Sequence, residues 1–342
     1  NNSIIDDNIL SLCKDKSGII WVGTFLGKGI SRLQRDLVKF NKISQQVSNK
    51  NSLNNNVVWA IHKDDENILW VGTYHGGLNR IDLNKNEYKF FKHNPDDAFS
   101  LSDNHIRSIE EDSKGNLWIG TYSGGLNLFD KKTEKFFRHQ NEILDLNSLS
   151  ADQVQSVHID SDSTIWVGTF GGGLNKVIIN DKRDLINIKF KAYMNDPDDS
   201  TSLSDDRIYT IFEDHEGILW IGTYGGGLNR FDKNKGEFFA YKNDPDNPNS
   251  ISEDKVVSIE EDKNFNLWIG TYGGGLNRFN REENNFTRII DMGGVETDVI
   301  YGILTDEKNN LWMSSDNGII KFNPQSFSSS QYDLKDGVQS ME

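Results

Sequence analysis

Short apolar runs, separated by Gly, Asn, Asp and Pro, recur along the chain with the pattern of β-strands and their turns. The segment 250–289 shows one unit, in which a Ser-Ile-Ser lead-in is followed by four β-rich runs. These runs are Val256–Asp262, Leu267–Thr271, Gly275–Phe279 and Phe286–Ile289. Each is rich in Val, Ile, Phe or Trp and is bounded by turn-forming residues, so we expect four strands, called A to D in chain order.

The unit occurs seven times, and each copy has a Trp preceded six residues earlier by an Asp. The tryptophans, separated by 44 to 54 residues, are Trp21, Trp70, Trp118, Trp166, Trp220, Trp268 and Trp312. The aspartates are Asp15, Asp64, Asp112, Asp160, Asp214, Asp262 and Asp306. A self-similar period of this length identifies a repeat architecture.

Four strands per period match one propeller blade, and no segment has the sustained period of a helical solenoid. We therefore expect an all-β fold, a seven-bladed β-propeller of four-stranded antiparallel blades, with residues 1–342 in one domain. The first and last copies are in the same phase. If each blade is contiguous, the ring closes by packing; a strand shared between the terminal blades is the alternative.

The repeated residues are expected to have structural roles. Each Trp supplies the apolar area that fills the gap between adjacent blades, and each Asp accepts backbone N–H hydrogen bonds in the A–B turn. Within strand A, the residue four before the Asp is always small, as crowding near the axis requires. These small residues are Ser11, Ala60, Ser108, Ser156, Thr210, Ser258 and Gly302.

Charge and composition exclude several classes of function. A net charge of −15 argues against binding to nucleic acid or to anionic lipid, because both need clustered Lys and Arg. The single cysteine, Cys13, cannot form an internal disulfide, and no zinc-type Cys/His spacing occurs. We expect no cofactor and no metal. No apolar run approaches the length of a membrane span, and the first residues lack the pattern of a signal peptide.

Two motifs carry a family resemblance. Copy three reads Leu117–Thr121 (LWIGT) followed by Gly124–Asn127 (GGLN), and copy five reads Trp220–Phe231 (WIGTYGGGLNRF). This sequence pattern resembles the two-component regulator propeller repeat in all seven copies. The resemblance implies the extracytoplasmic sensor region of a membrane-bound signalling receptor that detects glycan fragments. It also implies that the chain is excised from a larger receptor, periplasmic or at the cell surface, with a histidine kinase or cyclase output downstream. The resemblance leaves the receptor as either a monomer or a dimer.

With strand A innermost, the B–C hairpins and D–A connections emerge on one face, which is richest in recognition chemistry. Its hairpins have an aromatic residue four positions after the Trp, either for sugar stacking or for packing onto the next blade. These aromatics are Phe25, Tyr74, Tyr122, Phe170, Tyr224 and Tyr272.

At the start of strand A, two positions vary between repeats while the rest of the repeat stays uniform. The first set is Asn8, Val57, His105, Gln153, Arg207, Lys255 and Val299. The second is Leu10, Trp59, Arg107, Gln155, Tyr209, Val257 and Tyr301.

Because side chains alternate between the two sides of a strand, both sets lie on the same side of strand A. They either point towards the mouth of the channel or only fill the channel. There we expect a binding site for an acidic oligosaccharide. Aromatic members would stack on sugar rings, and cationic members would bind carboxylate or sulfate groups. The candidate binding residues are Trp59, Tyr74, His105, Arg107, Gln153, Gln155, Arg207, Tyr209, Lys255 and Tyr301.

A further ring of Asp and Asn lies eight residues before each A–B Asp. Its members are Asp7, Asn56, Asn104, Asp152, Asp206, Asp254 and Asp298. They either cap the turn into strand A or contact a ligand or cation.

Two other classes of function compete with a glycan sensor. In an enzyme, His105, His158, Tyr209 and Glu213 could supply acid and base groups, although no nucleophile or metal motif supports catalysis. In a scaffold, the flat faces would bind protein. Glycan binding without turnover separates the sensor from the enzyme, and a protein partner without sugar favours the scaffold.

Overall fold

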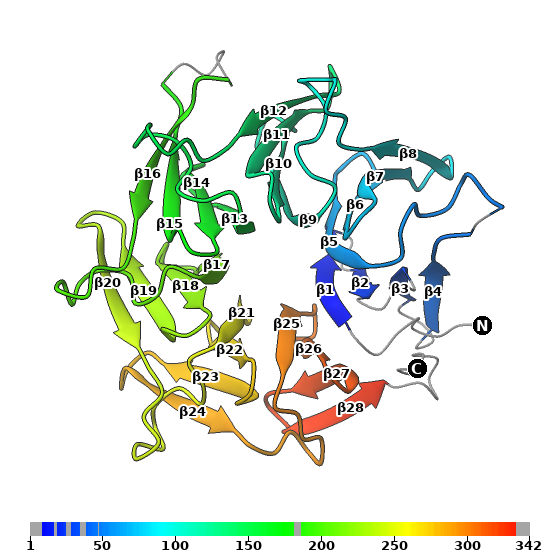
Figure 1. Cartoon of the computed structure of the whole chain (residues 1–342). Helices are drawn as coiled ribbons and strands as arrows, with labels where there is room; N and C mark the ends of the chain where they lie inside the picture. The colour runs from blue at the N-terminus through cyan, green and yellow to red at the C-terminus, as the bar shows by residue number, and fades with distance from the viewer. Residues whose placement is uncertain are drawn as a thin grey trace. The chain divides into compact units, whose positions relative to one another are not determined.

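A computed structural model describes residues 9–16, 19–24, 29–34, 39–46, 48–180 and 186–332. These residues form 28 strands in seven four-stranded antiparallel sheets, with no helix among them. The predicted seven-bladed β-propeller is confirmed, and each blade consists of four consecutive strands (Figure 1).

The chain divides into two compact units, which are described separately. Unit 1 comprises Asn1–Phe90, Asn243–Glu253 and Val257–Glu342, and unit 2 comprises Phe91–Lys242 and Asp254–Val256. The strands of unit 1 are β1 (Ile9–Lys14), β2 (Ile20–Thr24), β3 (Ile30–Gln34), β4 (Lys39–Ile43), β5 (Val58–Lys63), β6 (Ile68–Thr73), β7 (Gly77–Asp82), β8 (Glu87–Phe91), β21 (Val256–Glu261), β22 (Leu267–Thr271), β23 (Leu276–Asn280), β24 (Asn285–Ile289), β25 (Ile300–Thr305), β26 (Leu311–Ser315), β27 (Gly318–Asn323) and β28 (Ser328–Tyr332). Those of unit 2 are β9 (Ile106–Glu111), β10 (Leu117–Thr121), β11 (Leu126–Asp130), β12 (Lys135–His139), β13 (Val154–Ile159), β14 (Ile165–Thr169), β15 (Leu174–Ile178), β16 (Lys189–Tyr193), β17 (Ile208–Glu213), β18 (Leu219–Thr223), β19 (Leu228–Asp232) and β20 (Glu237–Tyr241).

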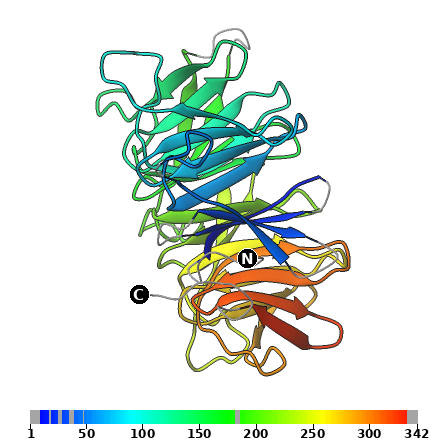
Figure 2. The same ribbon diagram turned by 90° about the vertical axis from the view of Figure 1, so that its right-hand side faces the viewer.

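Strand A is the innermost strand of its blade. In unit 2, β13 contacts the A strands β9 and β17 of the two adjacent blades, and in unit 1, β1 contacts β5 and β25 in the same way. The side view shows the first blade in dark blue beside the last in orange and red (Figure 2). No strand is exchanged between these two blades in the described ranges, so they meet by packing.

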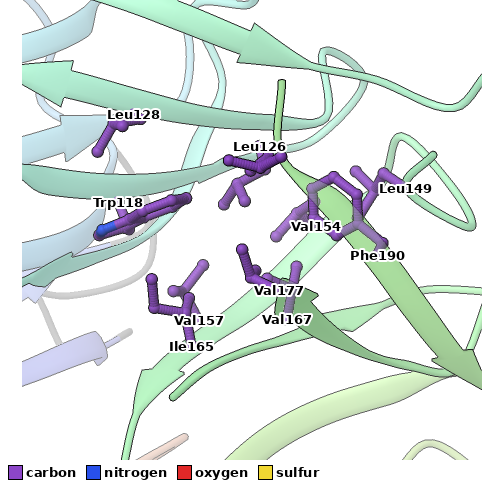
Figure 3. Packing of buried hydrophobic residues seen from close by; sticks show 11 residues of the cluster. Trp118, Leu126, Leu128, Leu149, Val154, Val157, Ile165, Val167, Val177 and Phe190 are labelled. Carbon is purple, nitrogen blue, oxygen red and sulfur yellow. The ribbon is translucent and has the colours of Figure 1, made fainter. Parts of the chain in front are cut away.

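The repeat tryptophans fill the space between blades, as predicted. All seven are at most 5% exposed. Trp118 of β10 packs in one cluster with Val157 and Ile165 of the next blade (Figure 3). Burial of a ring of this size is among the largest apolar contributions that one residue can make.

Each repeat aspartate holds two parts of its blade at once. In all seven repeats, Oδ1 accepts the backbone N–H four residues later, which closes the A–B turn and confirms the predicted role. In all seven, Oδ2 accepts the indole Nε1–H of the Trp, at 2.7 to 3.2 Å. This second bond was not predicted, and it explains the fixed six-residue spacing.

The small residue of strand A faces a small residue of strand B, which is a glycine in blades such as that of β9 and Ser314 in the last blade. Ser108 pairs with Gly120, where a Cβ atom would lie 2.5 Å from the Ser108 hydroxyl and 2.6 Å from a methyl group of Val154 in the next blade. Side chains are therefore excluded where neighbouring A strands approach, which confirms the predicted crowding.

In unit 1, side chains from both neighbours bind the backbone of the last blade. The Thr305 N–H donates to the Glu260 carboxyl group at 2.8 Å, and Lys14 Nζ donates to the Thr305 carbonyl oxygen at 2.6 Å. Protein atoms surround the Glu260 carboxyl group, although part of the residue stays accessible. Desolvation raises the pKa of Glu260 to about 7, against the opposing hydrogen bonds from Thr305 and the charge of Lys14.

Trp220→Ala is expected to lower the free energy of unfolding by roughly 3–5 kcal/mol, because it empties a large buried site and removes the indole donor to Asp214. Chemical denaturation followed by circular dichroism measures the loss. The control is Phe239→Ala, which truncates a 53% exposed aromatic and should cost under about 1 kcal/mol. Equal losses in the two variants would contradict the role of Trp220.

Stability is expected to fall as pH rises through neutrality. Because the folded pKa of Glu260, about 7, lies above the ordinary 4.5, its contribution is complete below 4.5 and is lost as pH rises through 7. Glu260→Gln should remove this dependence, which is on the order of 3 kcal/mol between the two limits. The measurement is a denaturation series over this pH range, and parallel profiles for the two proteins would overturn the assignment.

Candidate functional site

A β-bulge occurs near the start of strand A in each of the blades that begin with β1, β5, β9, β13, β17 and β25. In β9, for example, Ile106 pairs with Thr121 and Ser108 with Gly120, so Arg107 is the extra residue. The bulge residues are Leu10, Trp59, Arg107, Gln155, Tyr209 and Tyr301, which all belong to the second variable set. Bulges re-aim side chains and are frequent beside functional sites. Simple alternation could not predict this feature.

In the blade of β9, both variable residues contact the hairpin aromatic. The ring of His105 lies 6.2 Å from that of Tyr122, and the Arg107 guanidinium lies 4.9 Å from the same ring centroid. The Asp103 carboxylate contacts His105 Nδ1 at 2.7 Å and accepts the Ser123 N–H at 2.9 Å. Burial opposes ionisation of Asp103, but these hydrogen bonds prevail and lower its pKa.

Tyr224 is the centre of a second group in unit 2, and we call Phe170, Arg207, Tyr209, Tyr224 and Lys255 the Tyr224 cluster. Tyr209 stacks on Tyr224 at 6.2 Å between ring centroids, and Phe170 meets it edge-on at 5.6 Å. The charged groups of Arg207 and Lys255 lie 5.4 and 5.2 Å from its ring centroid. Three blades thus bring two cations and three aromatic rings together, at distances typical of cation–π attraction.

A carboxylate orients one of these cations. The Asp205 side chain accepts hydrogen bonds from Arg207 Nε at 2.9 Å and Nη2 at 2.5 Å. Burial of Asp205 opposes ionisation, but the bonds from Arg207 lower the pKa of the carboxyl group. Arg207 nevertheless keeps 44% of its side chain exposed, so its guanidinium stays accessible to solvent.

Asp103 and Asp205 were missed by the sequence reasoning. The sequence feature that could have indicated them is an Asp two positions before His105 in copy three and before Arg207 in copy five, in each case directly after a Ser. Both aspartates therefore lie two residues before the first variable position.

The ten candidate residues divide between the units. His105, Arg107, Gln153, Gln155, Arg207, Tyr209 and Lys255 lie in unit 2, and Trp59, Tyr74 and Tyr301 lie in unit 1. Gln153 and Gln155 are partly exposed at the start of the A strand between the two groups described above.

The unit 1 candidates contact hairpin aromatics. The ring centroids of Trp59 and Tyr74 are 6.3 Å apart, and those of Tyr272 and Tyr301 are 6.0 Å apart. The hairpin residues Tyr74, Tyr122 and Tyr272 are 37–44% exposed. Phe25 lies outside the described residues.

Four members of the ring of Asp and Asn have a structural role that differs from the predicted local cap. Oδ1 of Asn56, Asn104, Asp152 and Asp206 accepts the backbone N–H eleven residues earlier, so it ties the start of the D–A connection to the start of strand A. Asp7 lies outside the described residues. The part of the chain that the structure describes contains no group of three potential metal-ligating side chains.

The proposed acid and base groups do not form one site. His158 and Glu213 lie towards the far ends of β13 and β17, whereas Tyr209 lies near the start of β17, about 13 Å from Glu213 at strand geometry. Burial lowers the pKa of His158, and Glu213 is bound by Lys233 at 2.9 Å. Glu213 and Asp160 both pair with Lys233, in an ion-pair network between two blades.

Comparison with solved structures supports the β-propeller fold. The extracellular domain of a putative hybrid two-component system from B. thetaiotaomicron superposes on 94% of this chain and 40% of its own, with a TM-score of 0.76 and 24% identity. Streptogramin B lyase superposes on 94% of this chain and 95% of its own, with a TM-score of 0.69 and 16% identity. At these identities the likeness shows the propeller fold alone.

Sequence comparison then defines the repeats. The family model described as two-component regulator propeller matches residues 3–25, 52–75, 100–123, 148–171 and 202–225. Five of the seven copies therefore contain the two-component regulator propeller repeat that the motifs predicted. Histidine kinase P4 of Formosa agariphila is 29% identical over 167 residues, which are 46% of this chain and 12% of that protein. The chain thus spans less than half of the kinase and of the two-component extracellular domain. No helix in the described ranges is long and apolar enough to cross a bilayer.

Proposed function

We propose that this chain is the extracytoplasmic ligand-sensing domain of a membrane-anchored, two-component-type receptor, and that it binds a glycan fragment without turning it over. The repeat family and the likeness to a two-component extracellular domain support the sensing role. The observation that carries the proposal is the Tyr224 cluster, with its partly exposed rings and cations at the starts of A strands.

The chemistry of the cluster suits an acidic oligosaccharide. Aromatic faces pack against the apolar faces of sugar rings, and guanidinium and ammonium groups bind carboxylate or sulfate. Because the chain has a net charge of −15, an acidic ligand needs local cations to overcome long-range repulsion. Arg107, Arg207 and Lys255 provide them within unit 2, where His105, Gln153 and Gln155 add hydrogen-bonding groups.

Asp205 has a positioning role in this site. By holding two nitrogens of Arg207, it fixes the plane of the guanidinium beside Tyr224 and leaves the other donors for the ligand. Trp59, Tyr74 and Tyr301 are proposed as stacking residues in unit 1. The downstream partner would be the output domain of the receptor, and a receptor dimer would carry the signal.

A propeller lyase is the second candidate, since streptogramin B lyase shares the fold over nearly its whole length. Fold does not decide function, and the separation of Tyr209 from His158 and Glu213 disfavours a shared acid–base centre. Incubation of the chain with a bound oligosaccharide, followed by mass spectrometry, distinguishes the two. Unchanged ligand supports the sensor, and fragments carrying a new double bond support the lyase.

A glycan array first selects an acidic oligosaccharide that binds the chain. Arg107→Ala or Arg207→Ala is expected to weaken the binding free energy of this oligosaccharide by roughly 1.5–3 kcal/mol, which is the range of a charge-assisted hydrogen bond. Glu111→Ala is the control, because Glu111 lies at the far end of β9 and is bound by Lys131 at 2.7 Å. Calorimetry on each variant, after circular dichroism has shown it to be folded, measures the change. If Glu111→Ala abolishes binding while both arginine variants bind normally, the ligand site lies at the other end of the A strands.

A further inference from the structure

Cations occupy two places in unit 2, on either side of one blade. The A strands β9, β13 and β17 belong to consecutive blades, and β13 contacts both of the others (Figure 1). In the blade of β9, the Arg107 guanidinium lies beside the ring of Tyr122, and His105 contacts the same ring. We call these three residues the Tyr122 group. The Tyr224 cluster brings its two cations together on the other side of β13.

The blade of β13 has no cation at either variable position. Its variable residues are the amides Gln153 and Gln155, and both are partly exposed. Two positions before the first of them is Ala151, where copies three and five have Asp103 and Asp205. The acid that orients a cation is thus missing in the same blade as the cation. The blade differs from its neighbours at three related positions, which indicates a single purpose.

An aspartate makes this blade unfavourable for an anion. Oδ1 of Asp152 accepts the Asn141 N–H at 2.7 Å, which fixes the carboxylate at the start of strand A. The equivalent Asp206 precedes Arg207, whereas Asp152 precedes Gln153. A negative charge that no neighbouring cation offsets repels an acid group of a ligand. Glutamine side chains both donate and accept hydrogen bonds, as the hydroxyl and amide groups of an uncharged sugar require.

We propose that unit 2 selects its ligand by the spacing of charge, and that the ligand has two acidic sugars separated by an uncharged one. This selection rests on the proposed binding of an acidic oligosaccharide and adds the pattern of its charges. One acid group binds Arg107, and the other binds the cations of the Tyr224 cluster. The uncharged sugar lies over Gln153 and Gln155. Acids on successive sugars would place a further charge beside Asp152.

The two cationic places favour a ligand that reaches both. Each has a cation close to a tyrosine ring, so each can hold an acidic sugar by its acid group and by its apolar face. Asp205 already orients Arg207, so binding costs little ordering of that side chain. Because both contacts are made by one molecule, the second forms at the effective concentration that the linking sugar sets.

The first test is a glycan array of acidic oligosaccharides, sorted by charge pattern and read with the whole chain. Oligosaccharides with one uncharged sugar between two acidic ones should bind at least about tenfold more tightly than those of equal length with acids on successive sugars. A chain that binds no acidic oligosaccharide contradicts the proposed function itself. Binding that ignores the pattern, or favours successive acids, leaves that function standing and overturns selection by spacing.

Two substitutions of Gln155 separate charge from shape. Gln155→Arg transplants the bulge residue of β9 onto the equivalent bulge of β13, so the fold should accept it. It should shift the ratio of the two affinities at least about tenfold towards successive acids. Gln155→Tyr transplants the uncharged bulge residue of β17 and is the matched control. Equal shifts of the ratio in the two variants, both shown to be folded by circular dichroism, would contradict the role of charge.

A second measurement asks whether the two cationic places bind the two ends of one ligand. Calorimetry compares the preferred oligosaccharide with a derivative in which one terminal carboxyl group is reduced or one terminal sulfate is removed. Arg107→Ala and Arg207→Ala should each weaken the intact ligand at least about tenfold. With the derivative, one of the two substitutions should lose most of its effect. If both keep their full effect, the two arginines bind the same acid group and the proposed spacing is wrong.

Discussion

The hydrogen bond from each repeat Trp to the Asp six residues earlier is the constraint on which the propeller depends. A buried indole N–H without an acceptor is costly, and a buried carboxylate without donors is costlier. One aspartate resolves both, because Oδ1 closes the A–B turn while Oδ2 binds the ring that fills the gap to the next blade. The turn, the orientation of the ring and the packing between blades are thereby fixed together in every repeat.

This constraint acts at one end of strand A and leaves the other end free. The bulge residue lies five positions before the aspartate, about 16 Å away at strand geometry. There the sheet no longer dictates the side chain, so Trp59, Arg107 and Tyr209 can occupy equivalent places on equivalent backbones. Stability and recognition thus occupy opposite ends of the same strands, and a change at the variable end disturbs little of the core.

Differences between neighbouring blades follow the same principle. Equivalent bulges carry Arg107, Gln155 and Tyr209, and the strands pair in the same register around each of them. The charge at the variable end of a blade can therefore change from one copy to the next. In a repeat protein, such differences between copies point to interactions outside the domain more directly than does the polarity of any single residue.

The sequence by itself determined the strands, the blade boundaries and the seven-fold repeat, because these follow from local periodicity and turn residues that recur in each copy. It also indicated crowding at the small residues of strand A, and it offered a structural role for Asp152 and Asp206 as one of two alternatives. Only the tertiary structure revealed the indole bond, the bulges, the joining of Arg207, Tyr209 and Lys255 around Tyr224, and the pairing of Arg207 with Asp205. These features depend on distances between strands and between blades, and a pattern along one chain does not contain those distances.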